Sequence, residues 1–379
     1  MITLAPAAPL VPPALLAAPG AFAWWYVDLL DDAGDGLVLI WSWGLPFLPG
    51  VTGAIRAGAA APAAARPSIN LAVYEGGKES FYLLQERDPA RCSYTPAPAG
   101  PGGAGGCTWR FGETEITASW SADGAFHLRA AIDLPAPAGT GRVHGQVQVE
   151  GRVRGGRAAA VGAVLPDHEW APLCLAAQGE AALRCGAWSF ARSGRAYHDR
   201  NAGVSPLHTL GIGRWWWGRL AFPDRELVFY RLVAEGAAPA RDLVLEVRPD
   251  GAARVAAGAG IRVEAERRSL WGLRWPARLS FDDPDGRPVA VRLVHGVDDG
   301  PFYQRFLVEG RCDGASARGL AELVAPARFD PPYLRPLVRM RVHHPEGADS
   351  PWLPLFAGPA AGRWGRLLGR PPALTGGAA

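Results

Sequence analysis

Apolar residues in this chain occur in short runs, often alternating with polar residues, and most runs end at Gly, Pro or an Asp-Gly pair. A period of two is typical of half-buried strands, and no long stretch shows the 3.6-residue period of a helix. Strands are therefore predicted at Leu37–Trp43, Ile69–Tyr74, Phe81–Gln85, Ile116–Trp120, Phe126–Asp133, Val143–Val153, Leu227–Val233, Leu243–Arg248, Ala253–Ala256, Ile261–Ala265, Ala277–Phe281, Val289–His295, Tyr303–Cys312 and Ser316–Val324. Many short strands with regular turns predict an all-β fold of antiparallel barrels or sandwiches.

The breaks between these runs suggest how the chain is divided. Turns are predicted at Asp123-Gly124, Asp250-Gly251 and Asp285-Gly286. The Pro/Gly-rich stretch Pro96–Gly106 reads as a long surface loop, and Ala234–Ala240 (AEGAAPA) is the best candidate for a linker. We therefore predict a flexible segment at residues 1–20, an N-terminal β-domain at 21–235 and a C-terminal β-domain at 241–379.

Composition narrows the environment and the partners. The net charge is only +3 and the arginines are scattered, so nucleic acid is not expected as a partner. The apolar N-terminus contains prolines and lacks the basic start of a signal peptide, although its AxA-like end keeps that alternative open. No apolar run approaches the ~20 residues that span a bilayer. We expect a cytoplasmic protein, and leave open both its oligomeric state and peripheral contact with the inner membrane.

The five cysteines form an odd set without CxxC spacing. Free, buried thiols in a reducing compartment are favoured, with Cys92–Cys107 or Cys174–Cys185 as alternative pairs. The chain also has 15 tryptophans, large residues that line ligand pockets as well as cores.

The stretch Leu165–Arg219 gathers most residue types that can do chemistry. Its members stand two apart, in three groups: His168 and Trp170; Tyr197, Asp199 and Asn201; Trp215 and Trp217. Residues at i and i+2 of a strand point to one face of a sheet. If these segments are strands, an imidazole, a phenol, a carboxyl and several indoles can meet in one pocket, which suits acid chemistry on an apolar substrate.

Five motifs carry a resemblance to a known family: Trp24-Trp25-Tyr26-Val27-Asp28, His168-Glu169-Trp170, Tyr197-His198-Asp199-Arg200-Asn201, Arg335-Pro336-Leu337-Val338-Arg339-Met340 and Trp352-Leu353-Pro354-Leu355-Phe356. Between about residue 20 and residue 360 the chain resembles the carotenoid 1,2-hydratase (hydroxyneurosporene synthase) family. The resemblance implies two lipocalin-like β-barrel domains, with the ligand site in and beside the first. Fungal decalin-forming Diels–Alderases share this fold, so the resemblance informs on fold more than on substrate.

The family's reaction adds water to the terminal C=C of an acyclic carotenoid without a cofactor. The resemblance implies that Asp199 is the proton donor, with His168, Trp170 and Tyr197 as its partners. The residues themselves agree: burial among aromatic side chains raises a carboxyl's pKa and keeps it protonated. Aromatic faces stabilise a developing cation by roughly 0.5–2 kcal/mol each. His168 could hold the water or return the proton to Asp199.

The remaining aromatic and amide side chains are candidates for binding the substrate: Trp24, Tyr26, Asn201, Trp215 and Trp217. We expect an apolar polyene or isoprenoid substrate, no cofactor and no metal. His343, His344 and Glu346 match no familiar ligand spacing and are interpreted as a loop.

Each candidate also has a structural interpretation. Asp199 could be a turn residue that bonds its own backbone, and His168 a strand-end histidine satisfied by a carbonyl. The tryptophans could be core, and Asp28, near an acidic turn, is expected to be solvated. At the level of function, the alternatives are a polyene cyclase or pericyclase and a non-catalytic lipocalin-type carrier.

Overall fold

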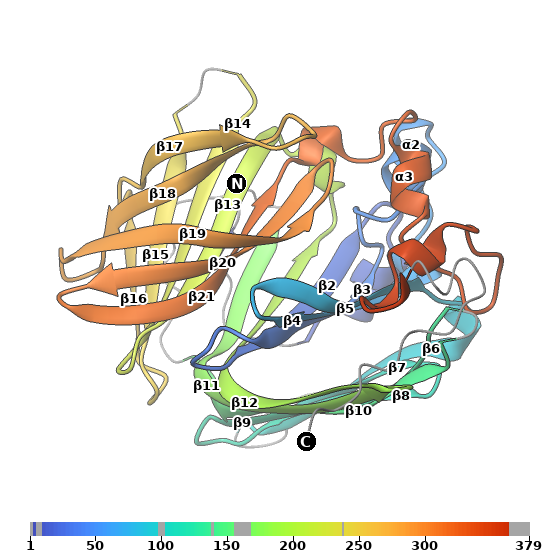
Figure 1. Ribbon diagram of the computed structural model, residues 1–379, viewed down its shortest axis with the longest axis horizontal. Coiled ribbons are helices and arrows are strands. Elements are labelled where there is room, and N and C mark those ends of the chain that lie inside the picture. Colours follow the sequence, from blue (N-terminus) through green and yellow to red (C-terminus); the bar gives the residue numbers. More distant parts are fainter. Residues whose placement is uncertain are drawn as a thin grey trace.

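The computed structural model describes residues 3–4, 10–97, 103–137, 140–154, 168–236 and 239–363. Within these ranges the chain forms two large, curled β-sheets with a few short helices at one end (Figure 1). Nearly all neighbouring strands pair antiparallel, as in the β12–β2 and β13–β21 pairs. The predicted all-β class with two lipocalin-like, curled antiparallel sheets is therefore confirmed.

The first sheet has 14 strands and contains most of the N-terminal half of the chain. In pairing order its strands are β22 (Val342–His343), β5 (Lys78–Glu86), β4 (Pro67–Glu75), β3 (Gly36–Trp43), β2 (Phe22–Leu30), β12 (Trp188–Gly203), β11 (Glu169–Cys185), β10 (Arg142–Arg152), β9 (Ala125–Pro135), β8 (Thr114–Trp120), β7 (Gly105–Phe111) and β6 (Cys92–Ala97). Two short strands join its side: β1 (Thr3–Leu4) on β11 and β23 (Gly358–Pro359) on β5.

The second sheet has nine strands. In pairing order they are β16 (Ala253–Ala257), β15 (Arg241–Val247), β14 (Glu226–Ala234), β13 (Ile212–Ala221), β21 (Ala315–Val324), β20 (Tyr303–Cys312), β19 (Pro288–Asp299), β18 (Arg274–Asp282) and β17 (Arg262–Arg268). The short α-helices are α1 (Pro13–Ala17), α2 (Val51–Arg56) and α3 (Arg335–Arg339). Helices α2 and α3 are joined through Asp330, which accepts hydrogen bonds from Gly53 N at 2.7 Å and from Arg335 Nε at 2.6 Å.

Every predicted strand overlaps an observed one, and all three predicted turns are present. The Asp-Gly turns need glycine because its φ is positive there, near 80–90° at Gly124, Gly251 and Gly286. The predicted loop Pro96–Gly106 is shorter than expected, since β6 runs to Ala97 and β7 begins at Gly105; residues 98–102 lie outside the described ranges.

The passage between the sheets does not coincide with the predicted linker. Ala234–Ala240 joins β14 to β15, two neighbouring strands of the second sheet. The chain instead leaves the first sheet at the end of β12 and enters the second at β13, so residues 204–211 make the connection. The end of the chain returns to the first sheet through β22 and β23. The predicted domain boundary between residues 235 and 241 thus falls within the second sheet, between its neighbouring strands β14 and β15.

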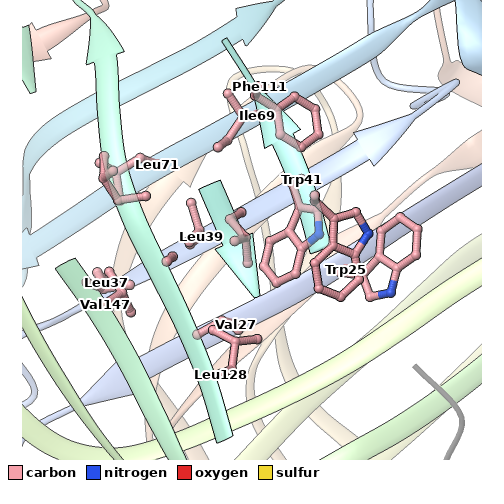
Figure 2. Close-up of a cluster of buried hydrophobic side chains, with 14 of the residues drawn as sticks. Trp25, Val27, Leu37, Leu39, Trp41, Ile69, Leu71, Phe111, Leu128 and Val147 are labelled. Atoms are coloured by element: carbon pink, nitrogen blue, oxygen red, sulfur yellow. The ribbon is translucent and has the colours of Figure 1, made fainter. Parts of the chain in front are cut away.

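Alternation along the strands sends side chains of the described residues into three large cores and one small pair, Ala171 and Leu173. One lies inside the curl of the first sheet and contains Trp25, Val27 and Trp41 (Figure 2). A second lies on one face of the second sheet, around Trp216 and Phe229. The third combines residues of both sheets. Because neighbours in sequence point to opposite faces, β2 sends Trp25 to the first core while Trp24 joins the core between the sheets.

The N-terminal segment predicted to be flexible contributes β1 and α1 to this fold. Leu16 of α1 is buried in the first core, and the backbone N–H of Val11 donates to the Tyr94 hydroxyl at 2.9 Å. All five cysteines are free, as favoured by their spacing, and only Cys92 is not buried. None of the described helices combines the length and the apolar character that a bilayer crossing requires.

A fully buried ion triad links the two sheets. Arg219 of β13 donates to the carboxylates of Asp28 on β2 and of Glu226 on β14, the latter at 3.2 Å. Glu226 also accepts from the backbone N–H of Ala176 at 2.6 Å, in the irregular part of β11. The expectation that Asp28 is solvated was wrong, because β2 is covered on both faces and its acidic turn begins only after Leu30. Burial raises the pKa of Asp28, and the neighbouring Arg219 opposes that rise.

Candidate active site

A cavity of about 570 Å³ lies between the two sheets, within the core that they share. Strands of both sheets line it, and Leu337, Val338 and Arg341 close one side. Its wall contains all five side chains predicted to bind substrate: Trp24, Tyr26, Asn201, Trp215 and Trp217. The site therefore lies outside the curl of the first sheet, between that sheet and the second one. The space inside the curl is filled by the residues of the first core.

Asp199 lies in the cavity wall at the centre of a hydrogen-bond cluster. Its Oδ2 accepts from the Tyr197 hydroxyl at 2.7 Å and from Trp170 Nε1 at 2.8 Å, and its Oδ1 accepts from Asn201 Nδ2 at 3.2 Å. The spacing of two along β12 places the phenol, the carboxyl and the amide on one face, as predicted. The alternative of Asp199 as a turn residue was wrong, because it lies within β12 and bonds to side chains.

The register of the first sheet explains why Trp170 reaches Asp199. In the β11–β12 pair Trp170 stands opposite Asn201, and in the β12–β2 pair Trp24 stands opposite Asn201 from the other side. Directly opposite residues share a face with Cβ atoms about 4.5–5.5 Å apart. Three neighbouring strands thus present an indole, an amide and an indole in one row, next to the carboxyl.

The surroundings of Asp199 favour its protonated form. The side chain is almost fully buried, and this burial raises the pKa of Asp199 to about 7, although the hydrogen bonds from Tyr197 and Trp170 lower it. A carboxyl with this pKa is about half protonated at neutral pH, far more than an ordinary aspartate, and remains a strong enough acid to give up its proton. Since Oδ2 already accepts two donors, the proton belongs on Oδ1.

His168 stands behind the cavity wall and orients the amide that touches Asp199. Its Nε2 lies 3.0 Å from Asn201 Oδ1, and its ring packs against Phe22 and Trp24. Burial lowers the pKa of His168 to about 3, so the ring is neutral and donates from Nε2 to the amide oxygen. Asn201 must then turn its NH₂ group toward Asp199. Neither His168 nor Tyr197 is among the residues that line the cavity.

The indoles and phenols form a continuous aromatic wall across the two sheets. The Trp217 ring lies 5.4 Å from the rings of both Tyr26 and Tyr197, and the Trp170 ring lies 5.5 Å from Tyr230. Trp215 and Trp217 face the cavity, whereas Trp216 points into the core on the other side of β13. Trp215 and Trp217 therefore belong to the core and line the cavity at the same time, because the cavity lies inside the core that the two sheets share.

The second sheet adds polar groups that the sequence did not single out. Glu322 of β21 and Tyr303 and Arg305 of β20 line the cavity together. Tyr303 and Arg305 are two residues apart on one strand, the same spacing that identified Tyr197 and Asp199. They were missed because they belong to none of the motifs that carry the family resemblance. Their bonds to Glu322 are described below.

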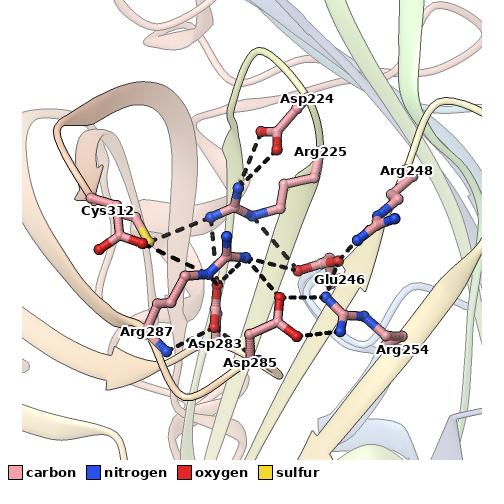
Figure 3. A network of polar contacts seen from close by, with 10 residues as sticks. Asp224, Arg225, Glu246, Arg248, Arg254, Asp283, Asp285, Arg287 and Cys312 are labelled. Carbon is pink, nitrogen blue, oxygen red and sulfur yellow. Dashed lines mark hydrogen bonds and ion pairs between the residues drawn. The ribbon is translucent and has the colours of Figure 1, made fainter.

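A cluster of three carboxylates elsewhere in the second sheet has the spacing of a metal site. Oxygens of Glu246, Asp283 and Asp285 lie within 4.8 Å of one another. Arginines already occupy the space a cation would take: Arg254 donates to Glu246 at 2.6 Å, and Arg287 to Asp283 at 2.7 Å (Figure 3). This is an ion-pair network of the fold, and it lies apart from the cavity lining.

The C-terminal histidines are likewise engaged in structure. His343 Nδ1 lies 2.8 Å from Asp349 Oδ2, and Glu346 is bound by Arg87, with Nη2 at 2.7 Å from Oε1. His343 belongs to β22 and not to a loop, so that part of the sequence interpretation was wrong.

Fold and site together define an all-β protein with a strongly buried acid, Asp199, in the wall of an aromatic cavity. Residues 118–350 match the model of the carotenoid hydratase CrtC family, and the chain belongs to that family. The predicted family, and with it the hydro-lyase class, is thereby confirmed.

Individual proteins support the assignment. The chain is 27% identical over 326 residues to the acyclic carotenoid 1,2-hydratase of Thiocapsa roseopersicina, covering 86% of this chain and 73% of that protein. It is 32% identical over 177 residues to the enzyme of the same name from Cereibacter sphaeroides, covering 46% and 58% respectively. The crystal structure of CghA with Sch210972 superposes with a TM-score of 0.55 at 15% identity, covering 81% of this chain and 89% of that chain, which shows a shared fold.

Proposed function

We propose that this protein adds water to the terminal C=C of an acyclic carotenoid or related isoprenoid, without a cofactor. The observation that carries the proposal is Asp199, a buried carboxyl with a raised pKa at the wall of an aromatic cavity. An unactivated alkene needs a strong, unionised acid, and a cation formed from it needs an apolar, aromatic surrounding. Membership of the carotenoid hydratase family supports the choice of substrate.

In the proposed reaction Asp199 transfers the proton on Oδ1 to the less substituted alkene carbon. The π-electron pair forms the new C–H bond, which leaves a tertiary carbocation and an Asp199 carboxylate. Tyr197 and Trp170 stabilise this carboxylate through their bonds to Oδ2. The faces of Tyr26, Trp215 and Trp217 surround the cation. Water then forms the C–O bond and loses one proton, giving a tertiary alcohol.

His168 has a positioning role in this proposal. Its burial keeps it neutral, and its bond is to Asn201 rather than to Asp199. It therefore cannot return the proton directly, as one sequence interpretation suggested. By fixing the Asn201 amide, it keeps an N–H donor at Asp199 Oδ1 and leaves the second position on that oxygen directed to the cavity.

The rate of the reaction should fall as the pH rises through about 7. Asp199 is active only when protonated, and its pKa is raised to about 7. Above that pH the protonated fraction drops about tenfold per unit, so kcat/KM should drop with it. The measurement is kcat/KM between pH 5.5 and 9, with folding followed by circular dichroism at each pH. A rate that increases steadily over this range would mean that the essential group must be ionised, and would contradict the assignment.

Isotope labelling tests the reaction itself. A carotenoid such as lycopene or neurosporene, dispersed in detergent, is incubated with the protein in deuterated, oxygen-18-labelled water. The product should have gained one molecule of water, with one deuterium on the carbon next to the carbinol and heavy oxygen on the carbinol. A product of unchanged mass would indicate cyclisation, and unaltered substrate bound tightly would indicate a carrier; either result would contradict hydration.

A further inference from the structure

Glu322 is one of the carboxyl residues that line the cavity, and it belongs to the sheet opposite Asp199. Its side chain is 13% exposed and lies on β21. Both of its hydrogen bonds are made by one oxygen: Oε1 accepts from the Tyr303 hydroxyl at 2.6 Å and from Arg305 Nε at 2.9 Å. Among the described residues, no hydrogen bond to Oε2 occurs, and Glu322 is part of the cavity lining. One oxygen is therefore anchored, and the other is available to a molecule in the cavity.

The register of the second sheet places Glu322 near the acid cluster. Trp217 of β13 stands directly opposite Glu322, and Arg305 of β20 stands opposite Glu322 on the other side. Opposite residues share one face of the sheet. The Trp217 ring in turn lies 5.4 Å from the ring of Tyr197, whose hydroxyl bonds to Asp199. The rings of Trp217 and Tyr197 thus connect the surroundings of Glu322 with those of Asp199.

Glu322 forms an ion pair with a buried arginine. Arg305 is buried, and it donates to Glu322 through Nε and to the Tyr74 hydroxyl through Nη1 at 2.6 Å. Asp199, by contrast, has no cationic partner among its hydrogen bonds. Asp199 and Glu322 therefore line one cavity in contrasting surroundings, the first without and the second with a cationic partner, which is the kind of difference that separates an acid from a base.

We propose that Glu322 is the general base of the hydration, accepting through Oε2 the proton that the attacking water must lose. The proposal rests on the proposed function and adds the residue that completes it. The anion also faces the cavity in which the carbocation forms, and so stabilises that charge. Consistent with its proximity, the Glu322 charge adds to the rise in the pKa of Asp199, after the larger effect of burial.

The proton balance closes without any further reactant. Asp199 loses one proton to carbon and becomes a carboxylate. Water bonds to the tertiary carbon and gives one proton to Glu322, which becomes neutral. Glu322 then releases that proton to solvent, and Asp199 takes up a proton from solvent. Both groups regain their starting states, and the net change is one water added to the alkene.

The test uses Glu322→Gln in the full chain, with lycopene in detergent and deuterated water. Glutamine keeps an oxygen for Tyr303 and Arg305 but cannot accept a proton. Hydration should fall about 10²–10⁴-fold, the usual contribution of a general base. Protonation by Asp199 should continue, and the uncaptured cation should lose a proton again. Recovered substrate should therefore carry deuterium from E322Q and none from Asp199→Asn.

Two further variants complete the experiment. Glu322→Asp keeps the charge beside Arg305 and should fold even if E322Q does not. Its side chain is one methylene shorter, so the carboxylate lies farther from the reacting water. We expect slower hydration and deuterium in the recovered substrate. Glu309→Gln, on the exposed side of β20 and paired with Arg292, should hydrate like the wild type. Wild-type hydration rates in both Glu322 variants would overturn the assignment of the base. A wild-type protein that neither hydrates nor labels the carotenoid would overturn the proposed function, and this assignment with it.

Discussion

Replacing Asp199 by asparagine is expected to reduce hydration by about 10³–10⁴-fold, the upper part of the range for a positioned acid. The substitution keeps the volume of the side chain and removes the proton that starts the reaction. Its oxygen can still accept from Tyr197 and Trp170, which bond to one carboxyl oxygen in the wild type. The new NH₂ group would replace Oδ1, which in the wild type accepts from the Asn201 amide, so two NH₂ donors would face each other. A small loss of stability is therefore expected with the large loss of rate.

The measurement is hydrated carotenoid formed per protein molecule, by mass spectrometry, with the melting temperature as a check on folding. Asp133→Asn is the matched control, because Asp133 is a half-exposed strand residue paired with Arg142. Near-normal turnover in a folded Asp199→Asn protein, with the control unchanged, would show that another group supplies the proton.

Replacing Arg219 by methionine is expected to destabilise the protein by about 3–5 kcal/mol. The variant leaves two carboxylates, Asp28 and Glu226, fully buried without their cation. Burial already raises the pKa of both groups against the effect of Arg219, and its loss raises them further. The folded variant then binds more protons than the unfolded chain, so its stability should fall as the pH rises. Urea unfolding at pH 5.5 and pH 8 measures both effects.

Two companion variants make this result specific. Arg142→Met breaks a half-exposed pair with Asp133 and should change the free energy of unfolding by about 0–1 kcal/mol. Adding Asp28→Asn and Glu226→Gln to Arg219→Met removes the stranded charges and should restore part of the lost stability. A triple variant less stable than Arg219→Met alone would mean that the arginine acts through packing and not through charge.

Strand positions and the centre of the site could be predicted from the sequence because both depend on local patterns. Alternation with a period of two located the strands, and the same period placed Tyr197, Asp199 and Asn201 on one face. Trp170 joined them through a motif about thirty residues away, and the structure brings it to 2.8 Å from Asp199.

What the sequence could not provide depends on pairing between distant strands. The connection between the sheets was placed near residue 240 because the AEGAAPA stretch resembles a linker, yet the strand pairs put it before β13. Glu322 and Arg305 reach the cavity only because β21 lies beside β13. Asp28 was expected to be solvated because an acidic turn follows it, and its actual partner, Arg219, lies 191 positions away in sequence.

The return of the chain end to the first sheet has a consequence for biosynthesis. β22 and β23 pair with β5, so residues 342–359 complete an edge that begins at residue 78. Such distant pairing is slow to form, because a long loop must close first. While the protein emerges from the ribosome, β5 therefore has an unpaired edge until residues 342–359 have been synthesised. In that interval the nascent chain is exposed to edge-to-edge association, and a chaperone that holds it should raise the yield of folded protein.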